Sequence, residues 1–314
     1  MYSIGIDLGG TSMAVGLVDS EGVIKSRVSA LTGLVKTSDE ILKDLVVLCN
    51  HILSDNNLTY DDIKHIGIGI PGTMNPESGV VEFTSNLNFE NVPVYEILKK
   101  DIPVPVYIEN DANCAALAEN TYGAAKGCKS SITITIGTGI GGGIILDNKI
   151  LNGAFFGGGE VGHHVILTGG RQCNCGRKGC WEAQASATAL IHYGRETAIE
   201  HNDSEIYKMV NGDLDKINAK TVFDAYDSGD KYAAVIVDKY MNFLAEGLVN
   251  MINIIQPGTI ALGGGVSARG EALLNPLKEI VSSKIYGIKG LQTKMVLAKL
   301  GNDGGIIGAA LLGE

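Results

Sequence analysis

The densest group of reactive side chains lies in the stretch CNCGRKGCWE. It places Cys173, Cys175 and Cys180, three of the chain's six cysteines, within eight residues. In a reducing compartment such spacing indicates a metal site rather than a disulfide. Zinc prefers four tetrahedral nitrogen or sulfur ligands, and the nearest candidates for the fourth are His163 and His164. A closed site of three Cys and one His would be structural, and the alternative is three ordinary loop thiols.

Two glycine-rich turns are candidates for binding phosphates. DLGGT (Asp7–Thr11) and GTGIGG (Gly137–Gly142) each follow an apolar strand. The second formally fits the dinucleotide fingerprint G-x-G-x-x-G, but that fingerprint opens a helix, whereas the residues after this turn predict a strand. Consecutive backbone N–H groups in such a hairpin suit nucleotide phosphates, and Asp7 could position Mg²⁺ directly or through water. The alternative for either turn is a plain tight hairpin.

A single carboxylate follows the predicted strand in VPVYIENDANCAALAE. Asp111 lies where this strand ends and a helix begins, so the helix N-terminus is expected to keep it ionised. Phosphoryl transfer requires mainly positioning and charge stabilisation, plus one carboxylate that accepts the proton of the attacking hydroxyl. Asp111 is a candidate for that base, and the alternative is a plain N-capping carboxylate. Taken alone, Glu160 and Glu182 would be solvated loop acids.

Strands and helices of two similar halves are expected to position these residues. Residues 2–28 predict an antiparallel meander of three short strands, followed by an amphipathic helix at 38–54 with a capping box at its start. The pattern begins again at 130–151, and helices are predicted at 231–255 and 271–286. We therefore predict an α/β fold of two related halves, divided near residue 112.

Composition excludes several classes of protein. A length of 314 residues favours two domains, and a net charge of −10 disfavours nucleic acid as a partner. No run approaches the ~18 apolar residues of a membrane span. The start, MYSIGIDLGG, lacks the basic region and cleavage site of a signal peptide. The chain is therefore expected to be soluble and cytoplasmic.

Seven motifs spanning nearly the whole chain resemble those of the ROK family of sugar kinases and sugar-responsive repressors, in the superfamily of hexokinase, actin and Hsp70. In order they are IGIDLGGT, IGIGIPG, IENDANCAALAE, TIGTGIGGGII, GEVGHH, CNCGRKGCWE and IALGGGVS. The resemblance is strongest to the bacterial glucokinase type. It implies two RNase H-like (actin-like ATPase) domains around a central cleft. The first would comprise residues 1–112 and a C-terminal helix at 302–314, and the second residues 113–301 with the zinc and adenosine loops.

The resemblance also implies a role for each motif, with Asp111 as the catalytic base. The sugar would contact Gly72, Asn86, Asn110, Asp111, Glu160, His163 and Glu182. ATP and Mg²⁺ would be bound by Asp7, Gly9, Gly10, Thr11, Thr138, Gly139, Gly263, Gly264 and Gly265. A structural Zn²⁺ would be bound by His163, Cys173, Cys175 and Cys180, and would fix the nearby sugar-binding residues relative to one another.

These roles predict an ATP-dependent hexose kinase that converts glucose to glucose 6-phosphate, with the homodimeric state that the family implies. The same motifs occur in kinases for N-acetylglucosamine, N-acetylmannosamine, mannose, fructose or allose, and polyphosphate is an alternative donor. A sugar-responsive regulator and a non-catalytic sugar-binding protein are the two candidate functions outside the kinases. The family's repressors carry a winged helix-turn-helix before the first phosphate turn, whereas only six residues precede Asp7 here, so a kinase is the favoured prediction.

Overall fold

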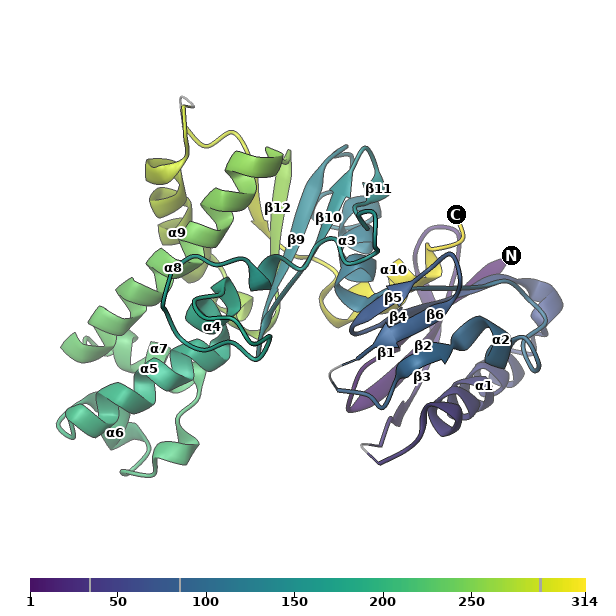
Figure 1. Ribbon diagram of the computed structural model, residues 1–314, viewed down its shortest axis with the longest axis horizontal. Coiled ribbons are helices and arrows are strands. Elements are labelled where there is room, and N and C mark those ends of the chain that lie inside the picture. Colours follow the sequence, from purple (N-terminus) through teal and green to yellow (C-terminus); the bar gives the residue numbers. More distant parts are fainter. Residues whose placement is uncertain (34, 85, 288–289) are drawn as a thin grey trace. The chain divides into compact units, whose positions relative to one another are not determined.

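The computed structural model describes residues 1–33, 35–84, 86–287 and 290–314. The chain forms two compact units, and each contains both helices and strands (Figure 1). Unit 1 comprises Met1–Thr133, Gly143–Gly159 and Ala298–Glu314, and unit 2 comprises Ile134–Gly142 and Glu160–Leu297. These limits differ from the boundary near residue 112, which stays a prediction about domains.

The sheet of unit 1 has the strand order β3-β2-β1-β4-β8. Its strands are β1 (Tyr2–Leu8), β2 (Ser12–Val18), β3 (Ile24–Leu31), β4 (Ile63–Ile70) and β8 (Val106–Asn110). The first three pair antiparallel, which confirms the predicted meander, while β4 pairs parallel with both β1 and β8. Because β1 and β8 flank β4, their carboxyl ends bring Asp7 and the Asn110–Asp111 junction to the same edge of the sheet.

Helices cover both faces of this sheet. Ile4 and Ile6 of β1 belong to the same core as α1 (Ser38–Asp55), whose predicted capping box of Thr37 and Glu40 is confirmed. The intervening Gly5 faces α10 (Gly304–Ala310). Successive side chains of a strand point to opposite faces, so α1 and α10 lie on opposite sides of the sheet.

Glycines let α10 pack directly on the strands and on α3 (Asp111–Thr121). A methyl group at Gly5 would lie 1.9 Å from Ile306 O, and one at Gly67, its partner across β1 and β4, 1.8 Å from Ala309 O. A methyl group at Gly308 would lie 1.7 Å from Cys114 O. This close backbone contact fixes α3, and with it Asp111, against the sheet.

A second sheet repeats the strand order of the first, in agreement with the two related halves that the sequence predicted. Its order is β11-β10-β9-β12-β13. The strands are β9 (Ser131–Ile136), β10 (Ile140–Leu146), β11 (Lys149–Ile150), β12 (Thr259–Gly263) and β13 (Lys294–Leu297). Each sheet therefore has two meander strands at one edge and two later strands at the other. The matching order confirms that the chain repeats one α/β plan.

Unit 2 is rich in helices. They are α4 (Trp181–Ala185), α5 (Ala187–Glu200), α6 (Glu205–Met209), α7 (Ala219–Asp227), α8 (Lys231–Ile255) and α9 (Glu271–Lys284). The predicted helix at 231–255 is confirmed, and that at 271–286 ends two residues earlier. α8 and α9 lie side by side, and α4 packs against α8 through the fully buried Trp181 (Figure 1). Unit 1 also contains a small sheet and a short helix: β5 (Thr73–Asn75), β6 (Val80–Phe83), β7 (Glu90–Pro93) and α2 (Val94–Leu98).

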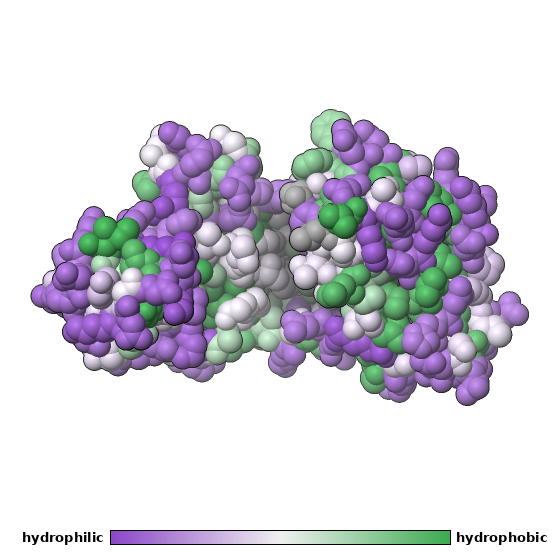
Figure 2. All heavy atoms as spheres, turned by 90° about the horizontal axis from the view of Figure 1, so that it is seen from below, coloured by the Kyte–Doolittle hydropathy of each residue, from purple (hydrophilic) through white to green (hydrophobic). Residues whose placement is uncertain are grey.

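The surface is mostly hydrophilic on the face shown in Figure 2, where hydrophobic residues form small separate groups. Among the described residues, no helix combines the length and the apolar character needed to cross a membrane.

Candidate active site

A buried threonine binds the backbone of the first glycine turn. Gly9 N–H donates to Ser12 O at 2.9 Å and closes the turn. The hydroxyl of Thr32, which is 0% exposed, donates to Gly9 O at 2.7 Å, and Thr32 N–H donates to Thr11 O at 3.0 Å. On another side a methyl group at Gly10 would lie 2.9 Å from Asn86 O. The turn is therefore fixed in one conformation by contacts that leave no room for a side chain at Gly10.

Asp7 and Asp111 form a pair of carboxylates beside this turn. Burial raises the pKa of Asp7 to about 6, with a further rise from the charge of Asp111 and an opposing effect of Arg27. Burial also raises the pKa of Asp111, although the N–H of Ala112 opposes it. Burial thus outweighs the helix N-terminus that the sequence suggested would keep Asp111 ionised. Two half-buried carboxylates that repel each other suit a hard cation with oxygen ligands, so the donor set fits Mg²⁺.

Asn110 is the N-cap of α3, so the alternative interpretation of Asp111 as the N-cap is wrong. The Asn110 side chain accepts the N–H groups of Ala112 and Asn113 and donates to Gly72 O at 3.2 Å. Gly72 itself has a φ of +112°, and a methyl group there would lie 2.3 Å from Phe83 O. Asn110 and Gly72, both predicted sugar contacts, therefore lie together, and Asp111 begins the helix, where its Oδ1 also accepts Ala112 N–H at 2.8 Å.

A buried carboxylate next to Asn110 was missed from the sequence. Glu109 is 4% exposed and accepts Asn110 N–H at 2.8 Å. It also accepts the side-chain amides of Asn113 at 3.0 Å and Asn152 at 2.8 Å. Glu109 thus joins the strand end that carries Asn110 and Asp111 to the segment after β11. Only its position in ENDAN could have indicated a role, because the sequence does not reveal Asn152 as a partner.

The second glycine turn lies against Glu182. Gly137 N–H donates to Gly139 O at 2.9 Å, and Ile140 N–H donates to Glu182 Oε2 at 3.0 Å. A methyl group at Gly139 would lie 2.2 Å from the same Oε2. Thr138, between these glycines, also lies in the turn, as predicted. Glu182 is therefore no solvated loop acid, because its carboxylate binds the turn.

The predicted adenosine loop follows β12. Gly263 ends the strand, and Gly264 has a φ of +83°. A methyl group at Gly264 would lie 2.5 Å from the carbonyl oxygen of Ile136, at the end of β9. Gly265 then begins a short 3₁₀ helix, Gly265–Arg269. Gly264 is thus required by both its backbone conformation and its close neighbour, and the loop keeps a fixed position next to β9.

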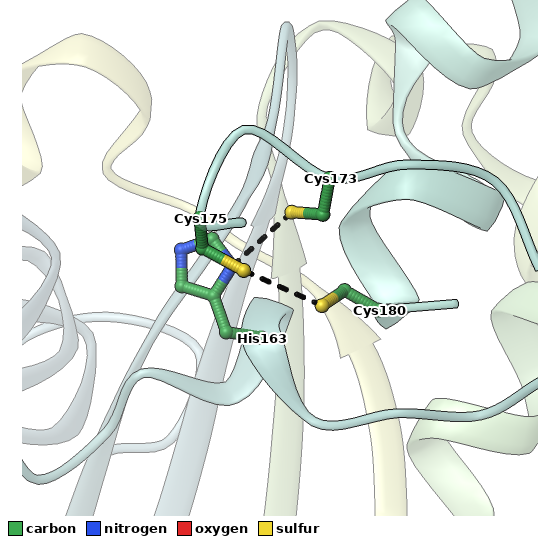
Figure 3. Close-up of side chains that lie close together, drawn as sticks. All are labelled: His163, Cys173, Cys175 and Cys180. Atoms are coloured by element: carbon green, nitrogen blue, oxygen red, sulfur yellow. Dashed lines mark hydrogen bonds between the residues drawn. The ribbon is translucent and has the colours of Figure 1, made fainter. Parts of the chain in front are cut away.

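The four predicted metal ligands come together in unit 2 (Figure 3). His163 Nδ1 lies 3.6 Å from Cys173 Sγ, and the Sγ atoms of Cys175 and Cys180 lie 3.6 Å apart. All four donor atoms are within 4.8 Å of one another. A tetrahedral zinc with Zn–S bonds of ~2.3 Å requires sulfurs ~3.8 Å apart, so these residues fit Zn²⁺.

His163, rather than His164, faces the cysteines. The His164 ring packs against Trp181, with ring centroids 5.4 Å apart, and its Nδ1 contacts Val161 O. His163 Nε2, on the opposite side of its ring from the cluster, lies 4.0 Å from Glu160 Oε2. Glu182 Oε1 lies 3.7 Å from Cys173 Sγ. The predicted sugar-binding residues of unit 2 therefore lie around the cysteine cluster.

Comparison with known proteins identifies the family. The chain matches the ROK family over residues 3–314. A glucokinase of Thermotoga maritima is 37% identical, with 98% of this chain and 95% of that protein covered. A crystal structure of a ROK family glucokinase from Streptomyces griseus in complex with glucose and AMPPNP is 31% identical, with a TM-score of 0.81 and coverage of 99% and 98%. A xylose repressor of Caldicellulosiruptor bescii is 30% identical, with 97% of this chain and 76% of the repressor covered. The protein belongs to the ROK family and has its actin-like ATPase fold.

Proposed function

We propose that the protein is an ATP-dependent hexose kinase that converts glucose to glucose 6-phosphate. The observation that carries this proposal is the half-buried pair of Asp7 and Asp111 beside the first glycine turn. One carboxylate is suited to bind a metal ion and the other to accept a proton, and phosphoryl transfer requires both functions. The similar glucokinases support glucose as the acceptor and ATP as the donor.

Asp111 would act as the general base. As the sugar hydroxyl oxygen attacks the γ-phosphorus, its proton passes to the Asp111 carboxylate while the bond to the leaving oxygen of ADP breaks. The raised pKa of Asp111 makes its carboxylate a stronger proton acceptor than an exposed aspartate. Asp7 would hold Mg²⁺, directly or through water, and the ion supplies charge stabilisation to the phosphates.

The remaining contacts of the sugar and the nucleotide would be made by residues of the predicted motifs. In unit 1 the sugar would contact Gly72, Asn86, Asn110 and Asp111, and the phosphates Gly9, Gly10 and Thr11. In unit 2 the sugar would contact Glu160, His163 and Glu182, the phosphates Thr138 and Gly139, and adenosine Gly263, Gly264 and Gly265. Fixed carboxylates and amides suit a sugar, because its hydroxyls both donate and accept, and an unmatched buried group costs about 1–3 kcal/mol.

We further propose that the cysteine cluster binds a structural Zn²⁺. Three thiolates and one imidazole fill a tetrahedral shell and leave no position for a reactive water. The donor distances support this assignment. The metal would hold the chain around Glu160, His163 and Glu182 in place. The two-domain division near residue 112 and a homodimeric state accompany this proposal as expectations from the family.

A coupled assay of ADP release tests the proposed function. Hexoses and N-acetylhexosamines would be supplied singly, each with ATP, and a parallel assay of sugar phosphate would use polyphosphate as donor. We expect ATP turnover to be highest with glucose. If only another sugar supports turnover, that sugar would replace glucose as the proposed substrate. If the protein binds a sugar but releases no ADP with any acceptor, a regulator or a sugar-binding protein would be favoured instead. The similarity to a xylose repressor makes this the main alternative.

A further inference from the structure

One short segment of unit 2 holds three backbone atoms of the second glycine turn. Ala187 N–H donates to Gly137 O at 2.9 Å, and the Thr188 hydroxyl donates to Thr138 O at 2.7 Å. Glu182 Oε2 accepts the N–H of Ile140 at 3.0 Å. The turn is thus bound at Gly137, Thr138 and Ile140 by residues 182–188.

The same segment is continuous with the cysteine cluster. Cys180 is a predicted metal ligand, and the next residue, Trp181, begins α4 and donates its N–H to His164 O at 2.9 Å. Trp181 is 0% exposed, and a methyl group at Gly247 of α8 would lie 2.0 Å from its ring. Glu182 follows and contacts Cys173 Sγ. Only Trp181 separates the predicted metal ligand Cys180 from Glu182, so one short, packed segment joins the cluster to the residues that bind the turn.

From these contacts we infer that Thr188 and Glu182 are positioning residues for ATP. They hold the second glycine turn in the conformation that receives the phosphates, and they connect it to the metal-binding loop. The inference rests on the proposed function and extends it, because the metal then determines nucleotide affinity as well as sugar affinity. The first glycine turn is held by Thr32 of unit 1 instead, so the effect should be confined to the second turn.

Two substitutions remove the bonds to the turn one at a time. Thr188→Val keeps the shape of the side chain and deletes the donor, and Thr188→Ser restores the donor as a matched control. Ala187→Pro removes only the N–H that binds Gly137 O, because Ala187 is the first residue of α5, where proline is well tolerated. The preceding Ser186 has φ −77° and ψ 170°, which a following proline favours.

The measurements are calorimetric binding of a non-hydrolysable ATP analogue and steady-state kinetics with glucose. We expect Thr188→Val and Ala187→Pro each to weaken analogue binding and raise KM for ATP by about 3- to 10-fold, the effect of one hydrogen bond. KM for glucose should change less than about 2-fold, and Thr188→Ser should resemble the wild type. Cys175→Ser, stripped of metal, should also weaken analogue binding.

The outcomes separate this inference from the proposed function. A wild-type protein that neither binds the analogue nor releases ADP would overturn both. A wild type that turns over ATP, with unchanged KM for ATP in Thr188→Val and Ala187→Pro, would overturn the positioning role alone. Loss of glucose affinity with normal analogue binding in metal-free Cys175→Ser would overturn the connection to the metal. Glucose binding by Thr188→Val and Ala187→Pro shows that these two variants are folded.

Discussion

The two glycine turns make a similar contact but rest on different supports. In each, a threonine hydroxyl donates to a turn carbonyl at 2.7 Å, from Thr32 to Gly9 in the first and from Thr188 to Thr138 in the second. Thr32 directly follows β3 and is 0% exposed. Thr188 is half-buried and stands in the first turn of α5, shortly after the cysteine cluster. The first turn therefore depends on the apolar core, and the second on a loop that a metal would organise.

The carboxylates beside the two turns also differ. The first turn has two carboxylates beside it, Asp7 and Asp111, both with a raised pKa. The second has Glu182, whose carboxylate already accepts a backbone N–H. We therefore expect substitutions near the first turn to alter the chemical step, and those near the second to alter binding.

The largest effect is expected from Asp111→Asn. The amide cannot accept the hydroxyl proton, so kcat should fall by about 10²- to 10⁴-fold, while calorimetry still detects glucose binding. Asp61→Asn, at an exposed aspartate of the same unit, is the matched control and should keep wild-type kinetics. Near-normal turnover of Asp111→Asn would show that the residues beside the first turn do not determine the chemical step.

Of the two glycine turns, only the second should be affected by removal of the metal. In Cys175→Ser we expect zinc content to fall from about one per chain, and glucose affinity to fall by about 10- to 100-fold. Hydrogen exchange should accelerate at residues 137–142 and stay unchanged at residues 7–12. The control is Cys128→Ser, outside the cluster. Equal acceleration at both turns would show that the metal stabilises the whole protein.

Asp7→Asn should increase stability at the expense of function. The folded-state pKa of Asp7 is about 6, above its ordinary 3.8, so the carboxyl favours folding while protonated and opposes it as pH rises through that interval. We expect Asp7→Asn to raise the free energy of unfolding at pH 8 by about 1–3 kcal/mol, with no gain at pH 3. Urea unfolding at both pH values measures this difference. A loss of stability at pH 8 would mean that Asp7 is held by favourable contacts instead.

The smallest effect is expected from Thr32→Val. Loss of the bond to Gly9 O should lower the free energy of unfolding by about 1–2 kcal/mol and raise KM for ATP several-fold. Thr32→Ser should recover most of both. Chelation of the metal should change stability by the same amount in Thr32→Val and in the wild type, because this support is independent of the cluster. Different changes in stability in the variant and the wild type would show that the two turns are coupled.

The sequence predicted what depends on local pattern. The meander of residues 2–28, the capping box of Thr37 and Glu40, and the helix at 231–255 follow from periodicity and capping residues. The resemblance to the ROK family implied His163, rather than His164, as the neighbour of the cysteines, and the structure places it there.

What depends on distant partners was not predictable. Thr32 meets Gly9, and Thr188 meets Thr138, only after the sheets and helices have packed. The burial that raises the pKa of Asp111 comes from tertiary packing, whereas the sequence displayed only the helix N-terminus. Glu109 likewise gained a role through Asn152, which is 43 residues away.

Transfer of the γ-phosphoryl group of ATP to glucose is the reaction that both turns are proposed to serve. Phosphorus NMR of a mixture of the protein, Mg²⁺, ATP and glucose measures it directly. We predict that ADP and glucose 6-phosphate appear in equal amounts with the wild type, and that Asp111→Asn forms neither at a comparable rate. A wild-type protein that binds ATP and glucose in calorimetry, yet leaves the ATP signals unchanged and forms no sugar phosphate, would contradict the proposed activity.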